Sequence, residues 1–364
     1  MRVEATGITL KYGDSVAVDN LDLSVPDGEA LVLLGQSGCG KTSTMRCIAG
    51  LETPQRGRIV IGDSVVYDES KGYSKPPHRR NIGMVFQSYA IWPHLSVFDN
   101  VAFPLRMKRA AKQVIRSKVD ECLELVGLSH LAGRGASLLS GGQMQRVALA
   151  RSLAMEPSIL LLDEPLSNLD ARLRDRLRVE LRSIQQRLGL TSVYVTHDQA
   201  EAMALADQIA LMQNGRIVQS GTPQQIYEHP RDATIASFFG IDNILPCTWS
   251  DASAVKLAGA EFSLLTDRSD NAAPSAADIR ACIRAEDITL YKKEVAPATA
   301  MHGVVTVVTY HGAIERYELR IADEVSLSVV VPVQQGFSAK PGDLVAADVR
   351  PNAVRVLPGS GEST

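Results

Sequence analysis

The sequence predicts an α/β layer fold with a mostly parallel sheet, followed by a small all-β domain. Up to about residue 240, short apolar runs alternate with stretches of helical periodicity. Such runs are typical of strands buried on both faces, and the intervening helices favour parallel pairing. Beyond Gly240 the chain is Val-rich and broken by Gly and Pro, which indicates an antiparallel barrel or sandwich. The four apolar runs are Ala30–Gly35, Asn81–Gln87, Ser158–Glu164 and Thr191–His197.

Turn signals and periodicity predict the further elements. One hairpin is expected over Arg58–Tyr67, with its turn near Gly62-Asp63, and another over Gln208–Gly221, with its turn at Asn214-Gly215. Leucine and isoleucine recur at three- and four-residue spacing over Ala171–Gly189, which predicts an arginine-rich amphipathic helix with a solvated face. The first strand-like segment is Ile8–Lys11, and Asp267–Asp278 reads as a polar loop.

Composition excludes several classes of protein. The 364 residues are 45% hydrophobic and 22% charged, which is ordinary for a globular chain and unlike a disordered or collagen-like one. No apolar run approaches the roughly 18 residues of a membrane span, and the first residues lack the apolar core of a secretory signal. Five scattered cysteines without a C-x-x-C pair favour neither a disulfide frame nor a zinc site. We therefore expect a chain without a span of its own.

Net charge argues against a dedicated nucleic-acid binder. The whole chain carries −3, and the part from Asp242 onward has 11 basic and 16 acidic residues. A phosphate backbone attracts clustered Lys and Arg, so an acidic C-terminal region is unsuited to it. No nucleic-acid partner is expected, and anion handling belongs to the N-terminal part.

A glycine-rich loop follows the first apolar run. Gly35–Thr42 reads GQSGCGKT, which fits G-x-x-x-x-G-K-[ST] between a strand and a predicted helix, Thr42–Ala49. The glycines let backbone N–H groups converge on phosphates at a helix N-terminus. Lys41 is placed to reach the β- and γ-phosphates, and the Thr42 hydroxyl to ligate Mg²⁺. A chance glycine turn is the alternative, and the strand–loop–helix setting argues against it.

A second apolar run ends in two carboxylates. Ile159–Glu164 reads ILLLDE, so Asp163 and Glu164 lie at the end of a buried strand. Asp163 can hold Mg²⁺ beside Thr42, and Glu164 can orient or deprotonate a water aimed at the γ-phosphate. An ordinary acidic turn is the alternative, which the glycine-rich loop makes less attractive.

Between these two motifs lies a further glycine turn. Leu139–Gln143, reading LSGGQ, opens an amphipathic helix, and such a turn is a second anion-binding device. Ser140 can equally be a plain helix N-cap. If the turn binds phosphate, then one nucleotide is held by both loops, or each loop serves a different nucleotide.

Together these segments resemble the ATP-binding cassette (ABC) ATPases of transporters. Gly35–Thr42 resembles their Walker A motif, Ile159–Glu164 their Walker B motif and Leu139–Gln143 their signature motif, in the family order. The resemblance covers residues 1 to about 240. It implies an α/β P-loop NTPase cassette with a helical subdomain at about residues 88–157, and it implies ATP and Mg²⁺.

The resemblance also assigns single residues. Tyr12 matches the aromatic that stacks on adenine, Gln87 the Q-loop glutamine, His197 the switch histidine and Ser167–Asp170 the D-loop. The alternatives are an edge-strand tyrosine, a surface glutamine and a structural histidine, while Asp198 and Glu201 read as a solvated helix start. The implied ATP-binding residues are Tyr12, Gly35, Gln36, Ser37, Gly38, Cys39, Gly40, Lys41, Thr42, Ser43, Leu139, Ser140, Gly141, Gly142, Gln143 and Asp170, with Glu164, His197 and Gln87 in catalysis and Thr42, Gln87 and Asp163 at Mg²⁺.

Partners follow from the same resemblance. In the family, two cassettes close head-to-tail on two ATP molecules, which implies a homodimer. The segment after the Q-loop receives integral membrane permease subunits, and Ser88–Leu105 carries a dense apolar and aromatic cluster suited to that contact. Plain packing of the helical subdomain is the alternative. A solute-binding protein is implied indirectly, and the implied location is peripheral, at the cytoplasmic face of the plasma membrane.

Residues 241–364 resemble the OB-like regulatory domain of importer ATPases for maltose, polyamines and ferric ion. Cys282–Leu290 resembles a family repeat that has Pro where this chain has Ala285, and Ser237–Leu245 departs from the sugar-importer version. With Ile91–His94, these departures favour polyamine, ferric ion or organophosphonate over sugar as the solute. A soluble ABC ATPase acting on nucleic acid, and a different P-loop enzyme such as a kinase, are the rival functions; the signature motif argues against the kinase.

Overall fold

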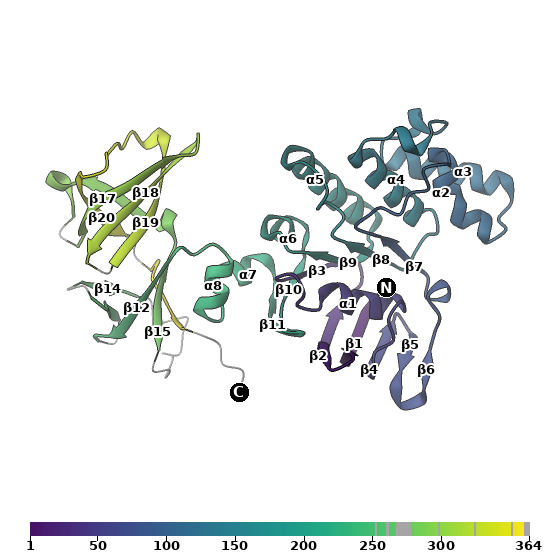
Figure 1. The fold of residues 1–364 in the computed structure, drawn as a ribbon, viewed down its shortest axis with the longest axis horizontal. Helices are drawn as coiled ribbons and strands as arrows, with labels where there is room; N and C mark the ends of the chain where they lie inside the picture. The colour runs from purple at the N-terminus through teal and green to yellow at the C-terminus, as the bar shows by residue number, and fades with distance from the viewer. Residues whose placement is uncertain are drawn as a thin grey trace. The chain divides into compact units, whose positions relative to one another are not determined.

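The chain forms two compact units, Met1–Ile226 and Tyr227–Thr364 (Figure 1). The computed structural model describes residues 1–251, 253–259, 262–266, 278–297, 299–323, 325–350 and 352–359. Of the predicted polar loop Asp267–Asp278, residues 267–277 lie outside these ranges. None of the helices in the described ranges is both long and apolar enough to cross a bilayer.

A six-stranded sheet forms the centre of the first unit, in the order β11-β10-β3-β9-β8-β7. Its pairs are parallel except for β10 with β11, which form the predicted hairpin around Asn214-Gly215. Every residue of β3, β8 and β9 is buried, as the continuous apolar runs predict. The strands are β3 (Ala30–Leu34), β7 (Ile82–Val85), β8 (Ile159–Asp163), β9 (Thr191–Thr196), β10 (Gln208–Gln213) and β11 (Arg216–Gly221).

A second, antiparallel sheet in the same unit has the order β2-β1-β4-β5-β6. The hairpin predicted over Arg58–Tyr67 is confirmed as β4 and β5, but β2 was not predicted. The alternation from Leu21 to Val25 is the signal that reveals it, since Leu21, Leu23 and Val25 are buried and the residues between are exposed. The strands are β1 (Val3–Tyr12), β2 (Ser15–Val25), β4 (Arg56–Ile61), β5 (Ser64–Asp68) and β6 (Tyr73–Ser74).

Helix α1 (Lys41–Ala49) lies between the two sheets (Figure 1). Its Met45 and Ile48 are fully buried in one cluster with Ile8 and Val18 of the antiparallel sheet and Leu161 of the parallel sheet. This burial fixes the start of the helix, where the predicted phosphate loop ends.

The remaining helices of the first unit cover the parallel sheet and build the helical subdomain. The subdomain predicted at about residues 88–157 contains α2, α3 and α4, and α4 packs against β7 (Figure 1). The predicted arginine-rich helix is α5, which ends at Gly189 with φ of 58°. The helices are α2 (Val97–Met107), α3 (Lys112–Leu125), α4 (Gly141–Leu153), α5 (Ala171–Leu188) and α6 (Gln199–Leu205), and α7 (Pro223–Glu228) spans the division between the units.

The described residues of the second unit form an all-β domain that is preceded by the short helix α8 (Ala233–Phe238). Its two antiparallel sheets, β14-β13-β12-β15-β21 and β16-β20-β17-β18-β19, share one core that includes Val255, Ile283 and Tyr317. The strands are β12 (Asn243–Trp249), β13 (Ala254–Leu257), β14 (Ser263–Leu265), β15 (Ile279–Ile283), β16 (Ile288–Lys292), β17 (Met301–Tyr310), β18 (Ile314–Ala322), β19 (Val325–Pro332), β20 (Leu344–Val349) and β21 (Arg355–Pro358).

A buried asparagine joins the two sheets of this domain. Asn243 on β12 donates from Nδ2 to the carbonyl oxygens of Ile283 (3.2 Å) and Ser328 (2.9 Å), and its Oδ1 accepts from Ser328 N (2.7 Å). Both polar atoms of the amide group are thereby engaged with backbone through three hydrogen bonds, which makes its burial inexpensive.

Candidate nucleotide site

The predicted phosphate loop (Gly35–Gly40) connects β3 to α1. The side chain of Lys41 folds back into it, and Nζ donates to the carbonyl oxygens of Gly35 and Gln36, each at 2.8 Å, with Cys39 Sγ 3.6 Å away. Lys41 is 5% exposed. The loop therefore carries a buried cation at the N-terminus of a helix, a combination that favours anions.

Two glycines of this loop leave no room for a side chain. Gly35 has φ of 155°, and a Cβ there would lie 2.3 Å from the carbonyl oxygen of Met212. Gly40 has φ of 103°, and a Cβ would lie 2.3 Å from the carbonyl oxygen of Ala17. Because both neighbours are backbone atoms, the close approach requires glycine at each position.

Thr42 and Asp163 meet where α1 begins and β8 ends. Thr42 Oγ1 donates to Asp163 Oδ1 at 3.0 Å. Burial raises the pKa of Asp163, which is 7% exposed, while the Thr42 hydrogen bond opposes the shift. A hydroxyl and a carboxylate are hard oxygen ligands, so this pair fits Mg²⁺.

The three predicted catalytic side chains meet, because Gln87 and His197 both contact the Glu164 carboxylate. Gln87 Nε2 donates to its Oε2 at 3.1 Å, and His197 Nδ1 lies 3.1 Å from its Oε1. An ionised carboxylate only accepts, so His197 Nδ1 carries the proton in this contact. These residues follow β7, β8 and β9, whose carboxyl ends meet at one edge of the sheet.

The backbone at Glu164 is also unusual. Its φ is 41°, which is uncommon for a residue other than glycine, and its N–H donates to the carbonyl oxygen of Val195 at 3.0 Å. Ser167 Oγ donates to the Glu164 carbonyl at 2.9 Å, and Asn168 Nδ2 donates to the Gln87 carbonyl at 3.0 Å. The segment predicted as a D-loop thus holds both neighbouring turns in place.

The signature turn (Leu139–Gln143) caps α4. Ser140 and Gln143 form a reciprocal capping box, and Gly142 lies so close to α5 that a Cβ would be 2.9 Å from Leu173 Cδ2. None of the hydrogen bonds given by the described residues joins this turn to the phosphate loop.

Two further predicted site residues lie outside these turns. Asp170 caps α5 by accepting from Leu173 N at 3.0 Å, and Tyr12 ends β1 with 48% of its surface exposed.

One expectation for this region is wrong. Asp198 caps α6 as expected, but Glu201 is buried rather than solvated: its Oε2 accepts from Thr196 Oγ1 (2.7 Å) and Tyr194 OH (3.2 Å). Arg174 on α5 lies over the same helix start, with Nη1 3.3 Å from Asp198 Oδ2. Sequence position within a helix does not reveal a neighbour on another helix.

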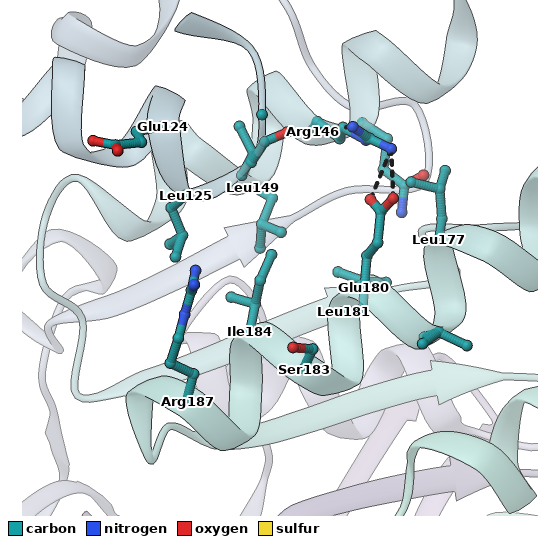
Figure 2. A pocket seen from close by; sticks show the side chains of 14 residues that line it. Glu124, Leu125, Arg146, Leu149, Leu177, Glu180, Leu181, Ser183, Ile184 and Arg187 are labelled. Carbon is teal, nitrogen blue, oxygen red and sulfur yellow. Dashed lines mark hydrogen bonds and ion pairs between the residues drawn. The ribbon is translucent and has the colours of Figure 1, made fainter.

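A separate cavity of about 440 Å³ lies between α3, α4 and α5. Figure 2 shows Leu125, Leu149 and Ile184 turned toward it, with Arg146 paired to Glu180 at its side. None of the predicted ATP-site residues lines it. Its apolar walls belong to the packing between the helical subdomain and α5.

Comparisons with known proteins agree with this arrangement. A family model for the ABC transporter matches residues 18–167, and a TOBE domain model matches residues 281–357. The trehalose/maltose import ATP-binding protein MalK of Thermococcus litoralis is 48% identical over 71% of this chain and 70% of its own. The Fe(3+) ions import ATP-binding protein FbpC of Brucella melitensis is 47% identical over 78% of each chain, and that of Agrobacterium fabrum is 44% identical over 85% and 84%.

Solved structures extend the agreement to the fold. CbiO1 from Clostridium perfringens, described as part of the ABC transporter complex cbiONQ, is 29% identical with a TM-score of 0.57 over 62% of this chain and 90% of that one. A nucleotide-free ATP-binding cassette from an ABC transporter, 22% identical, has the same score over 66% and 99%. The chain therefore belongs to the ATP-binding subunits of ABC importers, which hydrolyse ATP to drive transport, and it carries the C-terminal OB-like domain of that family.

Proposed function

We propose that this subunit hydrolyses ATP at the edge of the parallel sheet where the phosphate loop, Asp163 and Glu164 converge. The observation that carries the proposal is the meeting of Gln87 and His197 on the Glu164 carboxylate, beside the Thr42–Asp163 pair. Backbone N–H groups of the loop and the Lys41 ammonium supply the positive field for the triphosphate. The proposed binding residues of this copy are Tyr12, Gly35, Gln36, Ser37, Gly38, Cys39, Gly40, Lys41, Thr42 and Ser43.

Glu164 is the proposed general base. Its carboxylate follows a buried strand and is oriented by Gln87 and His197, so it can accept a proton from the attacking water. His197 is proposed to donate a hydrogen bond to the γ-phosphate, which needs the imidazolium form if Nδ1 still donates to Glu164. Gln87 is proposed to contact Mg²⁺ and the attacking water. Thr42, Asp163 and Gln87 would hold Mg²⁺, which neutralises charge on the β- and γ-phosphate oxygens when bound.

A second copy of the chain is proposed to complete each site. The signature turn makes no hydrogen bond to the phosphate loop of its own copy among the described residues, which supports its use by the opposite one. Leu139, Ser140, Gly141, Gly142, Gln143 and Asp170 would then act across the dimer.

Permease subunits are the proposed membrane partners, through the segment that follows Gln87. Trp92 packs against Phe103 with ring centroids 4.1 Å apart and the rings tilted by 46°, and Phe103 and Met107 on α2 are 36% and 69% exposed. Exposed apolar side chains of this kind fit a protein interface. We accordingly propose a peripheral location at the cytoplasmic face of the plasma membrane, with a solute-binding protein as an indirect partner and residues 241–364 as a regulatory domain.

Ferric ion is the solute that we propose, within the predicted class of ferric ion, polyamine and organophosphonate. The names of the FbpC relatives, which are ferric-ion import proteins, support this proposal. The departures from the sugar-importer pattern at Ser237–Leu245 support it as well. Sugar import is the second candidate, because MalK of Thermococcus litoralis is 48% identical. ATPase activity of the chain with its permease should rise with an iron-loaded binding protein; a rise with maltose or trehalose instead would favour the sugar.

The central experiment is the Glu164→Gln variant. It should bind ATP, form a dimer seen by light scattering, and lose about 10²–10⁴ in turnover because the base is gone. Glu121→Gln, at a surface carboxylate of α3, is the matched control and should hydrolyse normally. Undiminished hydrolysis by Glu164→Gln would overturn the base, and an ATP-loaded variant that stays monomeric would overturn the shared site.

A further inference from the structure

The turn that follows Gln87 has an unusual backbone. Tyr89 and Ala90 are consecutive and have φ of 61° and 48°, in the left-handed region that residues with a side chain rarely enter. Neither is glycine, so the surrounding structure must hold this turn in place. The contacts that hold the Tyr89-Ala90 turn also influence where Gln87 lies, because Gln87 is only two residues earlier in the chain.

The side chain of Arg151, on α4, holds the turn through two hydrogen bonds. Its Nη1 donates to the carbonyl oxygen of Ala90 at 2.6 Å, and its Nη2 donates to that of Tyr89 at 2.9 Å. The guanidinium also lies 5.0 Å from the ring centroid of Trp92, in a cation–π contact. One planar side chain thus fixes two strained peptides and the aromatic ring beyond them.

Asn100 on α2 fixes the next residue of the same segment. It is fully buried; its Oδ1 accepts from Trp92 N at 2.9 Å, and its Nδ2 donates to the carbonyl oxygens of Trp92 (3.1 Å) and Ser96 (3.0 Å). The segment from Tyr89 to Trp92 is therefore held from α4 and from α2.

Arg151 has no acidic partner among the described residues. Partial burial lowers the pKa of the guanidinium, and its charge is met by two backbone carbonyls and the face of the Trp92 ring. Removing part of a charged group from water costs free energy, which the hydrogen bonds to the two carbonyls offset. Arg151 stands in the last turn of α4, about 16 Å along the helix axis from Ser140.

We propose that Arg151 is a positioning residue that holds the Tyr89-Ala90 turn so that Gln87 reaches Glu164. Because Arg151 lies on α4 and also contacts the Trp92 ring, it connects that ring to the helix that the signature turn opens. This inference rests on the proposed catalytic role of Gln87. Arg151 touches neither the phosphate loop nor Glu164, so it acts only through the turn.

The test compares Arg151→Lys and Arg151→Met with the wild-type chain, alone and combined with Gln87→Ala. A lysine keeps the charge but has a single nitrogen, so it cannot reproduce the planar fork that places one guanidinium nitrogen on each of the two carbonyls. Both single variants should lose about tenfold to a hundredfold in kcat with KM for ATP changed by less than about twofold. In the Gln87→Ala background, neither should reduce kcat further, because the residue they position is gone.

Hydrogen exchange supplies a readout that does not depend on activity. Tyr89 N donates to the carbonyl oxygen of Phe86 (2.8 Å), and Trp92 N donates to Asn100 Oδ1. Both amides should exchange faster in the Arg151 variants. The matched control is Arg146→Met on the same helix, whose guanidinium also bonds a carbonyl, that of Val126, and pairs with Glu180. It should leave kcat and these two amides unchanged.

The outcomes separate this inference from the proposed function. An unchanged kcat in Gln87→Ala would overturn the catalytic role of Gln87 itself. A kcat loss from Arg151→Lys that persists undiminished in the Gln87→Ala background, or full activity of Arg151→Lys, would overturn the positioning role. If Arg151→Met fails to fold, Arg151→Lys carries the comparison.

Discussion

Glu201 is a carboxylate almost removed from water, next to the site but with no predicted part in it. It is 3% exposed, and two hydroxyls donate to its Oε2, with Arg174 Nε 3.9 Å from Oε1. Burial is the largest influence on its acidity and raises the pKa of Glu201 above the ordinary glutamate value of 4.5. The folded chain therefore holds a proton on Glu201 at a pH where the unfolded chain has released it.

This shift predicts a pH-dependent stability. As pH rises from 4.5 to the higher folded pKa of Glu201, the unfolded state binds fewer protons than the folded one, so the free energy of unfolding falls. Above that window the loss is complete and constant. Glu201→Gln, which cannot ionise, should gain stability relative to wild type across this window. Urea unfolding from pH 4 to pH 8 measures it, and a pH-independent difference would contradict it.

Local and distant partners explain which site residues the sequence could reveal. The phosphate loop is one continuous segment, and Gln87, Glu164 and His197 each follow an apolar run, so chain position alone places them at the sheet edge. Arg151 was not predicted, because its partners are backbone carbonyls on another segment, and the sequence gives no sign of which carbonyls need a donor.

At the scale of elements, the C-terminal end of α1 depends on one buried arginine. Arg80 is 3% exposed, and its Nη1 donates to the carbonyl oxygens of Cys47 (2.8 Å) and Ile48 (2.9 Å), while its Nε donates to that of Lys75 (2.7 Å). A cation at a helix C-terminus satisfies carbonyls that have no partner in the helix. Gly50 has no side chain there because a Cβ would lie 2.5 Å from Arg80 Nε.

Arg80→Met should therefore destabilise the chain by about 2–4 kcal/mol, because two buried carbonyls and a partly buried one lose a charged donor. The exposed neighbour Arg79→Met is the control and should change the free energy of unfolding by less than about 0.5 kcal/mol. Urea titration of both variants at one pH decides the matter; equal midpoints for Arg80→Met and Arg79→Met would show that the helix end needs no cap.

Strand prediction failed where the ladder is irregular. Strands β3, β8 and β9 are continuous apolar runs and were predicted, whereas only Ile8–Lys11 of β1 and no part of β2 was predicted. These two strands pair with register shifts after Ala5, Ile8 and Leu10. Such shifts break the alternation of buried and exposed side chains along most of the pair. The alternation survives only in short pieces, Ile8–Lys11 of β1 and Leu21–Val25 of β2 among them.

At the scale of the molecule, the change in composition and the division into units fall at different places. The sequence predicts a boundary after residue 240, where the Val-rich texture begins, whereas the second unit starts at Tyr227. Helix α8 is poor in Val, yet its Ala233 and Ala236 pack with Cys282 and Leu357 of the β-domain. The Val-rich composition marks where the strands begin, whereas the packed unit also includes the helix that precedes them.

The short segment before the strands should therefore stabilise the β-domain. Arg284 lies 3.4 Å from the ring centroid of Tyr227 and donates to its carbonyl oxygen, and Tyr227 OH donates to Glu286 at 3.1 Å. A fragment of residues 241–364 lacks these contacts and exposes Cys282 and Leu357. Its free energy of unfolding should therefore be at least about 2 kcal/mol lower than that of a fragment of residues 227–364. Tyr227→Leu in the longer fragment measures the combined share of the ring contact with Arg284 and the hydroxyl contact with Glu286. Identical urea midpoints for the two fragments would mean that the domain begins where the Val-rich texture does.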